Sequence, residues 1–420
     1  MSRRLTILAF AVIAAACGNR SAPAPAAAPA PAAAVAPAAA KSFYAQRFSR
    51  RASVPEMTEL GRQLFSDPQL SAAGNMSCAT CHDPRFAYAP PNDRSTQLGG
   101  PGLDTAGLRA VPSLRYLQTL PPFSEHHFDE AVDESVDQGP TGGHGWDGRA
   151  DTTHDQARLP LTSKLEMANP DVDSVVARVA RSPLGDRFRV AFGEDVFADP
   201  TRGSTALLLC LEVFQQSPKD FYPYSSRYDA YLRGKGQLTP AEQRGLALFN
   251  DPHKGNCASC HPSQVRHGAF PNFTDFGFNA VGVPRNRKLP ADADATFYDL
   301  GLCGPLRADL RSHKEYCGFF RVPSLRNVAV RRAFFHNGVF HRLDQVLEFY
   351  VERDTRPEKW YAKAGGRIDA YDDLPVAYRK NLNRDPPFGG KPGTAPALNK
   401  SEIRDVVAFL KTLTDADLPQ

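Results

Sequence analysis

The sequence predicts a mainly α-helical protein with long loops, built from two related halves. Two repeats support this fold class: Leu60–Pro68 resembles Arg244–Pro252, and Val111–Arg115 returns as Val322–Arg326. In each half, a Cys-x-x-Cys-His pentad lies between the repeated segments. Alternation of apolar and polar residues, the pattern of half-buried strands, is sparse. The repeated order indicates an internal duplication.

Helix signals mark both ends of the second half. Thr239 is typical of an N-cap, Pro240 of the first helical position and Glu242 of an acidic first turn. The apolar spacing of Ser401–Leu413 predicts a closing helix, and Leu343–Tyr350 is expected to be a helix that ends on a tyrosine.

The two pentads are the strongest functional signal. Cys78–His82 and Cys257–His261 each offer two thiols and an imidazole, which in an exported protein is typical of covalent haem c attachment. A zinc site or a disulfide is the alternative, but the pentad occurs twice within longer matching stretches. The thioether cysteines are then Cys78, Cys81, Cys257 and Cys260, and the proximal iron ligands are His82 and His261.

The N-terminus reads as a targeting segment. Two arginines precede the apolar run Leu5–Ala16, which is too short to span a bilayer, and Cys17 follows it in an imperfect lipobox. We expect residues 1–17 to be a signal peptide with a lipidated cysteine, and the Ala/Pro-rich residues 18–42 to be a tether. This predicts a periplasmic protein that meets the membrane only through a lipid anchor.

The remaining chain divides into two cytochrome c-like haem domains. The linker Gly234–Gly236 sets an N-terminal domain at residues 43–234 and a C-terminal domain at residues 235–420. The apolar fraction of 42% is ample for two cores, and the formal charge is only +4. With no basic run interleaved with aromatics, nothing indicates nucleic-acid binding.

The other cysteines have structural interpretations. Cys303 and Cys317 flank a polar loop, and an oxidising periplasm favours a local disulfide between them. Cys210 lies in an apolar run and is expected to be a buried thiol.

Methionine usage restricts the second haem. All four methionines lie at or before Met167, so the C-terminal half cannot supply the axial methionine that raises a cytochrome's potential. Several tyrosines stay open as the sixth ligand, together with the histidines His253, His267, His313, His336 and His341.

These features resemble a known family. The two pentads, the duplication and the segment Gly143–Asn169 resemble the bacterial dihaem cytochrome c peroxidases and the related MauG enzymes, over nearly the whole chain after the tether. The resemblance implies that Trp146 lies between the haems. It also implies that the distal pocket of the first, peroxidatic haem contains Gln156, Pro160 and Glu166.

The same resemblance bears on the second haem. The turn Phe335–Gly338 matches the family's aromatic-His-Asp/Asn-Gly turn. The peroxidases place an axial methionine fourteen residues after that histidine; here the position is Tyr350, as in MauG. Tyr350 is thus expected to be the sixth ligand, with a core tyrosine as the alternative.

Two departures from the family pattern matter. No histidine occurs between Asp83 and Phe123, where many of the peroxidases carry one that blocks the first iron, so we expect an open first haem. The usual calcium ligand, an asparagine, is Ala110 here; the matching carbonyl ligands would come from Arg331 and Ala333, and calcium stays open.

The predicted function is a dihaem peroxidase that reduces hydrogen peroxide to water at the N-terminal haem. The C-terminal haem relays electrons or stores oxidising equivalents through Trp146. The electron donor would be a small cytochrome c or cupredoxin. A MauG-like enzyme that oxidises a residue on a partner protein is the alternative, and a dihaem electron carrier is the second. Family members are often dimeric, which leaves a homodimer open.

Overall fold

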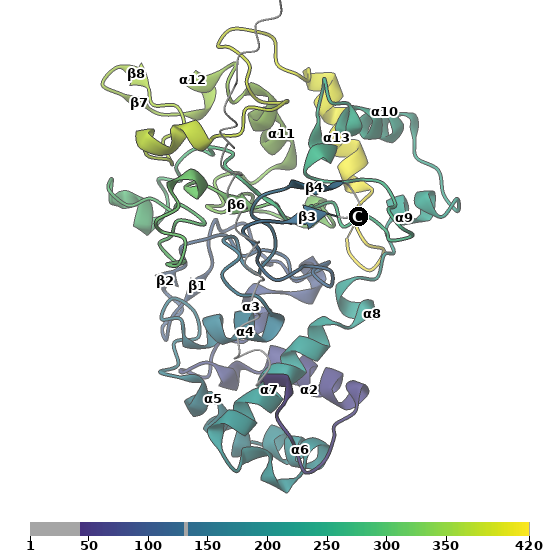
Figure 1. Ribbon diagram of the computed structural model, residues 1–420, viewed down its shortest axis with the longest axis vertical. Helices are drawn as coiled ribbons and strands as arrows, with labels where there is room; N and C mark the ends of the chain where they lie inside the picture. Colours follow the sequence, from purple (N-terminus) through teal and green to yellow (C-terminus); the bar gives the residue numbers. More distant parts are fainter. Residues whose placement is uncertain (1–42, 130–132, 420) are drawn as a thin grey trace, which may run out of the picture. The chain divides into compact units, whose positions relative to one another are not determined.

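Short helices joined by long loops carry most of the regular structure, as the sequence predicted. The computed structural model describes residues 43–129 and 133–419 (Figure 1), so the expected signal peptide and tether (1–42) lie outside the described residues. Gln46–Gln420 forms one compact unit, separate from Met1–Ala45. All elements below belong to the larger unit.

The helices are α2 (Val54–Ser66), α3 (Cys78–Cys81), α4 (Thr153–Thr162), α5 (Val172–Ala180), α6 (Pro183–Phe192), α7 (Pro200–Gln215), α8 (Pro218–Phe221), α9 (Arg227–Leu232), α10 (Pro240–Asn250), α11 (Leu343–Glu352), α12 (Pro357–Trp360) and α13 (Lys400–Lys411). The strands form four two-stranded antiparallel pairs: β1 (Leu98–Gly99) with β2 (Thr105–Ala106), β3 (Phe128–Asp129) with β4 (Asp133–Asp137), β5 (Phe278–Asn279) with β6 (Phe320–Arg321), and β7 (Lys363–Ala364) with β8 (Arg367–Ile368).

Helices α2 and α7 form the main helix pair of the first half (Figure 1). They cross closely because Gly61 has no side chain: a Cβ there would lie 2.0 Å from the carbonyl oxygen of Cys210. Phe65 and Phe214 pack edge to face beside this crossing, with ring centroids 5.5 Å apart. Cys210 is fully buried in α7, which confirms the expected buried thiol.

Helices α10 and α13 form the corresponding pair in the second half (Figure 1). Gly245, which occupies the repeat position of Gly61, would carry a Cβ 2.0 Å from the carbonyl oxygen of Asp405. The repeated glycine therefore marks a close helix crossing in each half.

The helix ends largely follow the sequence signals. Thr239 caps α10, and Pro240 is its first residue, as predicted. Helix α13 begins one residue before the expected Ser401 because the side chain of Asn399 caps it, accepting from the N–H groups of Ser401 and Glu402. It ends at Lys411, two residues earlier than expected.

The repeated Val-Pro-Ser-Leu-Arg segments of both halves meet near the C-terminus of the chain. The carboxylate of Asp415 accepts from Arg115 (2.9 Å) and from the hydroxyl of Tyr116 (2.6 Å), which end and follow the first segment. It also accepts from Asn327 (2.8 Å), which follows the second. All four side chains are buried, so one carboxylate joins the two repeated turns.

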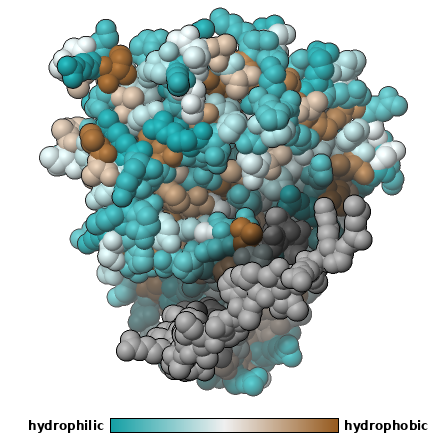
Figure 2. All heavy atoms as spheres, turned by 45° about the horizontal axis from the view of Figure 1, so that its top comes forward, coloured by the Kyte–Doolittle hydropathy of each residue, from teal (hydrophilic) through white to brown (hydrophobic). Residues whose placement is uncertain are grey.

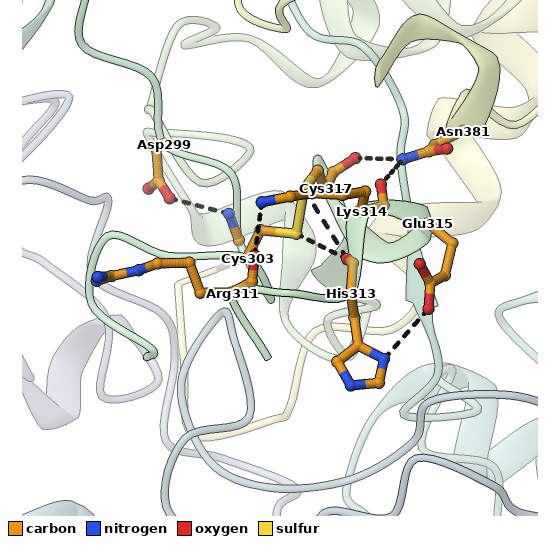
Figure 3. The surroundings of a disulfide bond; sticks show 9 residues. Asp299, Cys303, Arg311, His313, Lys314, Glu315, Cys317 and Asn381 are labelled. Atoms are coloured by element: carbon orange, nitrogen blue, oxygen red, sulfur yellow. Dashed lines mark hydrogen bonds and ion pairs between the residues drawn. A yellow bond between two sulfur atoms is a disulfide. The ribbon is translucent and has the colours of Figure 1, made fainter. Parts of the chain in front are cut away.

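A disulfide joins Cys303 to Cys317, confirming the pairing expected from the sequence (Figure 3). Asn381 holds the end of this loop by donating to the carbonyl oxygens of Lys314 (2.8 Å) and Cys317 (3.1 Å). The cross-link closes a loop that has little regular structure of its own.

The face drawn in Figure 2 is largely hydrophilic, with hydrophobic residues scattered among the polar ones. Within residues 43–129 and 133–419, every helix is too short or too polar to cross a bilayer.

Candidate haem sites

Two cavities contain the predicted haem-attachment residues. The cysteines and histidine of Cys78–His82 line the first cavity, of about 420 Å³. Those of Cys257–His261 line the second, of about 710 Å³. Both volumes fall within the range of about 300–1,000 Å³ typical of cofactor and small-molecule sites. None of the four pentad cysteines is in a disulfide, so all four sulfurs are available for thioether bonds.

One tight turn brings the three groups of each pentad to its cavity. The N–H of His82 donates to the carbonyl of Cys78 (2.9 Å), and the N–H of His261 donates to that of Cys257 (2.8 Å). The first turn is helix α3, and the second is a 3₁₀ turn over Cys257–Ser259. The local sequence thus builds the same arrangement twice.

The imidazoles of His82 and His261 are oriented for metal binding through Nε2. Their Nδ1 atoms lie 2.9 Å and 2.7 Å from the backbone carbonyl oxygens of Tyr88 and Phe273. A hydrogen bond of this kind fixes the tautomer and ring orientation of a ligating histidine. Burial lowers the pKa of each imidazole to about 4, so both rings are neutral, as iron ligation requires.

The predicted distal residues all line the first cavity. Gln156 and Pro160 come from α4, which Thr152 caps, and Glu166 follows the end of that helix. Burial raises the pKa of the Glu166 carboxyl, and a hydrogen bond with Ser163 opposes the rise. The structure therefore brings an amide and a carboxyl of raised pKa into the wall of the cavity that His82 also lines, the group that the resemblance implied.

Glycines hold Glu166 in place from the neighbouring loop. The N–H of Gly100 donates to the Glu166 carbonyl at 2.8 Å. A Cβ on Gly99 would lie 2.1 Å from the carbonyl oxygen of Leu165, so only glycine permits this approach. The backbone that carries the acid is fixed by packing.

Trp146 lines both cavities. Its indole Nε1–H donates to the carbonyl of Ala110 at 2.7 Å, and its own carbonyl accepts from the N–H of Arg321 at 2.9 Å. Because Ala110 and Arg321 directly precede the two repeated Val-Pro-Ser-Leu-Arg segments, the tryptophan is held by equivalent positions of both halves.

Tyr350 lines the second cavity from α11. Its ring stacks between Phe335 (5.8 Å between centroids) and Phe388 (5.2 Å). Burial, followed by the nearby Cys260 and Cys257 thiols, raises the pKa of its phenol. In this setting an anionic phenolate needs a positive partner, which a ferric iron would supply.

The structure narrows the alternatives for the second cavity. Of the histidines that the sequence left open, only His336 is among the described lining residues, and no methionine is. The His336 ring stacks on Phe320 at 3.6 Å, and its Nε2 lies 3.2 Å from a carboxylate oxygen of Asp373. A protein carboxylate thus already lies close to the imidazole, although His336 Nε2 has no hydrogen-bond partner. The ring of Tyr350 stacks on two other aromatic rings.

A histidine that sequence reasoning did not single out lines the first cavity. His126 and His127 lie away from it, but His144 is part of its wall and is 8% exposed. Gly143 makes this possible, since a Cβ there would lie 2.2 Å from the carbonyl oxygen of Gly148 and the loop could not close. Burial, and next the positive charge of Arg321, lower the pKa of His144 to about 3.

Two of the three positions linked to calcium accept hydrogen bonds from other residues. The carbonyl of Ala110 accepts from Trp146, and the carbonyl of Ala333 accepts from the guanidinium of Arg331 at 3.4 Å. The side chain of Ala110 is only a methyl group and offers no ligand atom. Among the described residues there is no cluster of three or more His, Cys, Asp or Glu that would hold a metal ion.

Two cysteine–histidine cavities that share a tryptophan define the chain as a dihaem c-type protein. Residues 55–237 match the model of the di-haem cytochrome c peroxidase family. The chain is 34% identical over 374 residues to the methylamine utilization protein MauG of Paracoccus denitrificans, an alignment that covers 87% of this chain and 90% of that protein. The chain belongs to the di-haem cytochrome c peroxidase family.

Other relatives agree. The cytochrome c551 peroxidase of Nitrosomonas europaea is 28% identical over 374 residues, covering 87% of this chain and 82% of that protein. The crystal structure of the diheme peroxidase BthA from Burkholderia thailandensis is 40% identical, with a TM-score of 0.77, and covers 90% of this chain and 91% of that one. The chain is therefore an oxidoreductase of the peroxidase class, and its cofactors are two haem c groups.

Proposed function

We propose that this protein reduces hydrogen peroxide to water in the first cavity, while the haem of the second cavity relays electrons through Trp146. The observation that carries the proposal is the carboxyl of Glu166, which lines the first cavity together with His82 and Gln156. The reaction consumes one peroxide, two protons and two electrons and yields two waters. A small donor such as a cytochrome c or a cupredoxin would supply the electrons.

The residues present fit the haem. Each cavity offers two free thiols and a neutral, oriented imidazole. When bound, the haem of the first cavity supplies the iron at which peroxide is reduced.

The chain's own residues move the proton. The Glu166 carboxylate takes a proton from one peroxide oxygen and returns it to the other, which leaves as water. The amide of Gln156, on the same wall, holds the peroxide by hydrogen bonding. Because the backbone of Glu166 is fixed by Gly99 and Gly100, the acid keeps its place through the reaction.

The second cavity would store or pass on oxidising equivalents. Tyr350 is the proposed sixth ligand there, since an anionic oxygen donor favours oxidised iron. Trp146 is the proposed route between the cavities because it forms part of both walls.

A MauG-like activity, in which peroxide drives oxidation of a residue on a partner protein, is the second candidate. Tyr350 and the similarity to the Paracoccus denitrificans MauG favour it. A pure electron carrier would need neither Glu166 nor Gln156. Either enzyme would act in the periplasm, tethered through Cys17; this location rests on the sequence alone.

Stopped-flow mixing of the fully oxidised holoprotein with peroxide tests the proposal. We expect a mixed high-spin and low-spin starting spectrum and rapid peroxide consumption without prior reduction. Sustained turnover with reduced cytochrome c supports the peroxidase, whereas consumption only with a partner protein supports the MauG-like enzyme. A wholly low-spin spectrum and no reaction with peroxide would instead support the function of a dihaem electron carrier.

A further inference from the structure

Arg321 is a buried cation in the wall of both cavities. It lies at the end of β6, its residue is 6% exposed, and its Nε donates to the carbonyl of Gly145 at 3.0 Å. Its Nη1 is buried and has no hydrogen-bond partner. With Trp146, it is one of only two described residues that line both cavities.

Two other deeply buried arginines of the described chain are paired with carboxylates. Arg109 contacts Asp147 (2.7 Å) and Asp299 (2.6 Å), and Arg326 contacts Asp229 at 2.7 Å. Arg321 forms no ion pair within 4.0 Å among the described residues. A buried charge without a partner is costly unless an anion compensates it.

The charge persists despite the burial. Burial lowers the pKa of Arg321 to about 10, and the more distant Asp147 opposes the fall. The guanidinium is therefore cationic at neutral pH, with the N–H groups of Nη1 still unused. Such a fork of donors matches a carboxylate in geometry as well as in charge.

The haems themselves bring carboxylates into these cavities, because each carries two propionates. We propose that Arg321 is a counter-ion shared by the two haems, its guanidinium binding a propionate carboxylate of the haem in each cavity. The proposal requires two haems, which family membership establishes, and does not depend on the peroxidase reaction.

Arg331 is a suitable comparison for Arg321 because it is a cation that lines only one of the two cavities. It lines the second cavity only, and burial lowers its pKa to about 10 as well. Its guanidinium forms no ion pair with a described carboxylate and donates weakly to the carbonyl of Ala333 at 3.4 Å. The two arginines thus are both cations without an ion pair, but Arg331 is only half-buried and lines one cavity instead of two.

The expected effect is electrostatic. A nearby positive charge stabilises reduced iron, so its removal lowers the reduction potential. Arg321→Gln should lower the potentials of both haems, each by about a tenfold change in the one-electron equilibrium constant, or about 59 mV. Arg331→Gln should lower only that of the second haem. Spectroelectrochemical titration of the holoproteins without peroxide measures this.

Arg321→Lys separates charge from geometry and guards against misfolding of the glutamine variant. It should keep both potentials near those of the unchanged protein, yet shift the propionate bending modes of both haems in resonance Raman spectra, because the bidentate fork is lost. A shift confined to one haem would overturn the sharing, and unmoved potentials and Raman modes would overturn the counter-ion itself. These readouts stand even if peroxide turnover is absent.

Discussion

The indole Nε1–H of Trp146 donates a 2.7 Å hydrogen bond to the backbone carbonyl of Ala110. Ala110 occupies the position at which the family resemblance implied a calcium ligand. In this chain its main-chain carbonyl holds the tryptophan that lines both cavities. The bond is to the main chain, so the identity of residue 110 does not affect its acceptor. What matters is the indole nitrogen.

Replacement of that indole should lower the stability of the protein and also slow electron transfer between the haems. Trp146→Phe leaves the buried Ala110 carbonyl unpaired, which costs about 1–3 kcal/mol of unfolding free energy, and should slow oxidation of the second haem by peroxide. Double-mixing stopped-flow of the half-reduced protein measures the transfer. Trp360→Phe is the matched control because Trp360 lines neither cavity. Equal rates in the two variants would remove Trp146 from the route.

Loss of the distal acid should slow the reaction with peroxide. Glu166→Gln preserves shape but cannot accept a proton, and general acid–base help is worth about a hundredfold to ten-thousandfold in rate. Stopped-flow kinetics of the diferric variant give the rate constant. Glu59→Gln, at a side chain that is 50% exposed, should behave as the unchanged protein. Kinetics unaltered by Glu166→Gln would exclude this carboxyl from the mechanism.

The dependence of the peroxide rate constant on pH should also reveal the Glu166 carboxyl. The active form of Glu166 is the carboxylate, and burial raises its pKa above the ordinary value of 4.5. The rate constant for peroxide consumption should therefore rise with pH through a range centred above 4.5 and then level off. In Glu166→Gln this acid limb should vanish; its persistence would point to another titrating group.

The proposed ligand of the second haem can be tested by spectroscopy. Tyr350→Phe removes the oxygen donor, and Tyr350→Met should raise the potential of that haem because a thioether replaces a phenolate. Ferric low-spin EPR signals and redox titration report both changes. Tyr361→Phe is the control, since that hydroxyl donates to the carbonyl of Gly282 at 2.6 Å and lies outside the cavity lining. A second-haem spectrum that ignores Tyr350 substitutions would reassign the ligand.

The disulfide should contribute measurable stability. It closes a loop with a sequence separation of 14, for which the chain-entropy model gives about 3 kcal/mol. The double variant Cys303→Ser, Cys317→Ser should lower the denaturation midpoint, and dithiothreitol should lower that of the unchanged protein to the same value. If dithiothreitol lowered the denaturation midpoint of the double variant by the same amount, its effect would not come from this disulfide.

Much of the fold could be predicted because its signals are local. The Thr239 cap lies within four residues of the turn it stabilises, and each pentad folds as one turn. The repeated glycines, Gly61 and Gly245, mark helix crossings whose partners, α7 and α13, carry no such repeat. Sequence comparison within the chain therefore located one member of each helix pair but not its mate.

The cavity walls were harder to predict. Arg321 reaches the first cavity from a strand far along the chain from Cys78, and its repeat counterpart is Ala110, so the duplication hides it. His144 was read as part of a matching segment, and only the closure of the loop at Gly143 turns it inward. Tertiary packing brings these residues to the cavity wall, and their spacing in the sequence does not predict it.

Asp415 has a consequence for the order of assembly. Its carboxylate completes the contacts of Arg115, Tyr116 and Asn327, and it follows both pentads along the chain. A chain that is synthesised from its N-terminus carries both pentads before Asp415 is added. Haem can then be attached to the pentads before this carboxylate joins the two repeated turns. A chain that stopped before Asp415 would then mature its cofactors but lack the carboxylate that joins the two repeated turns.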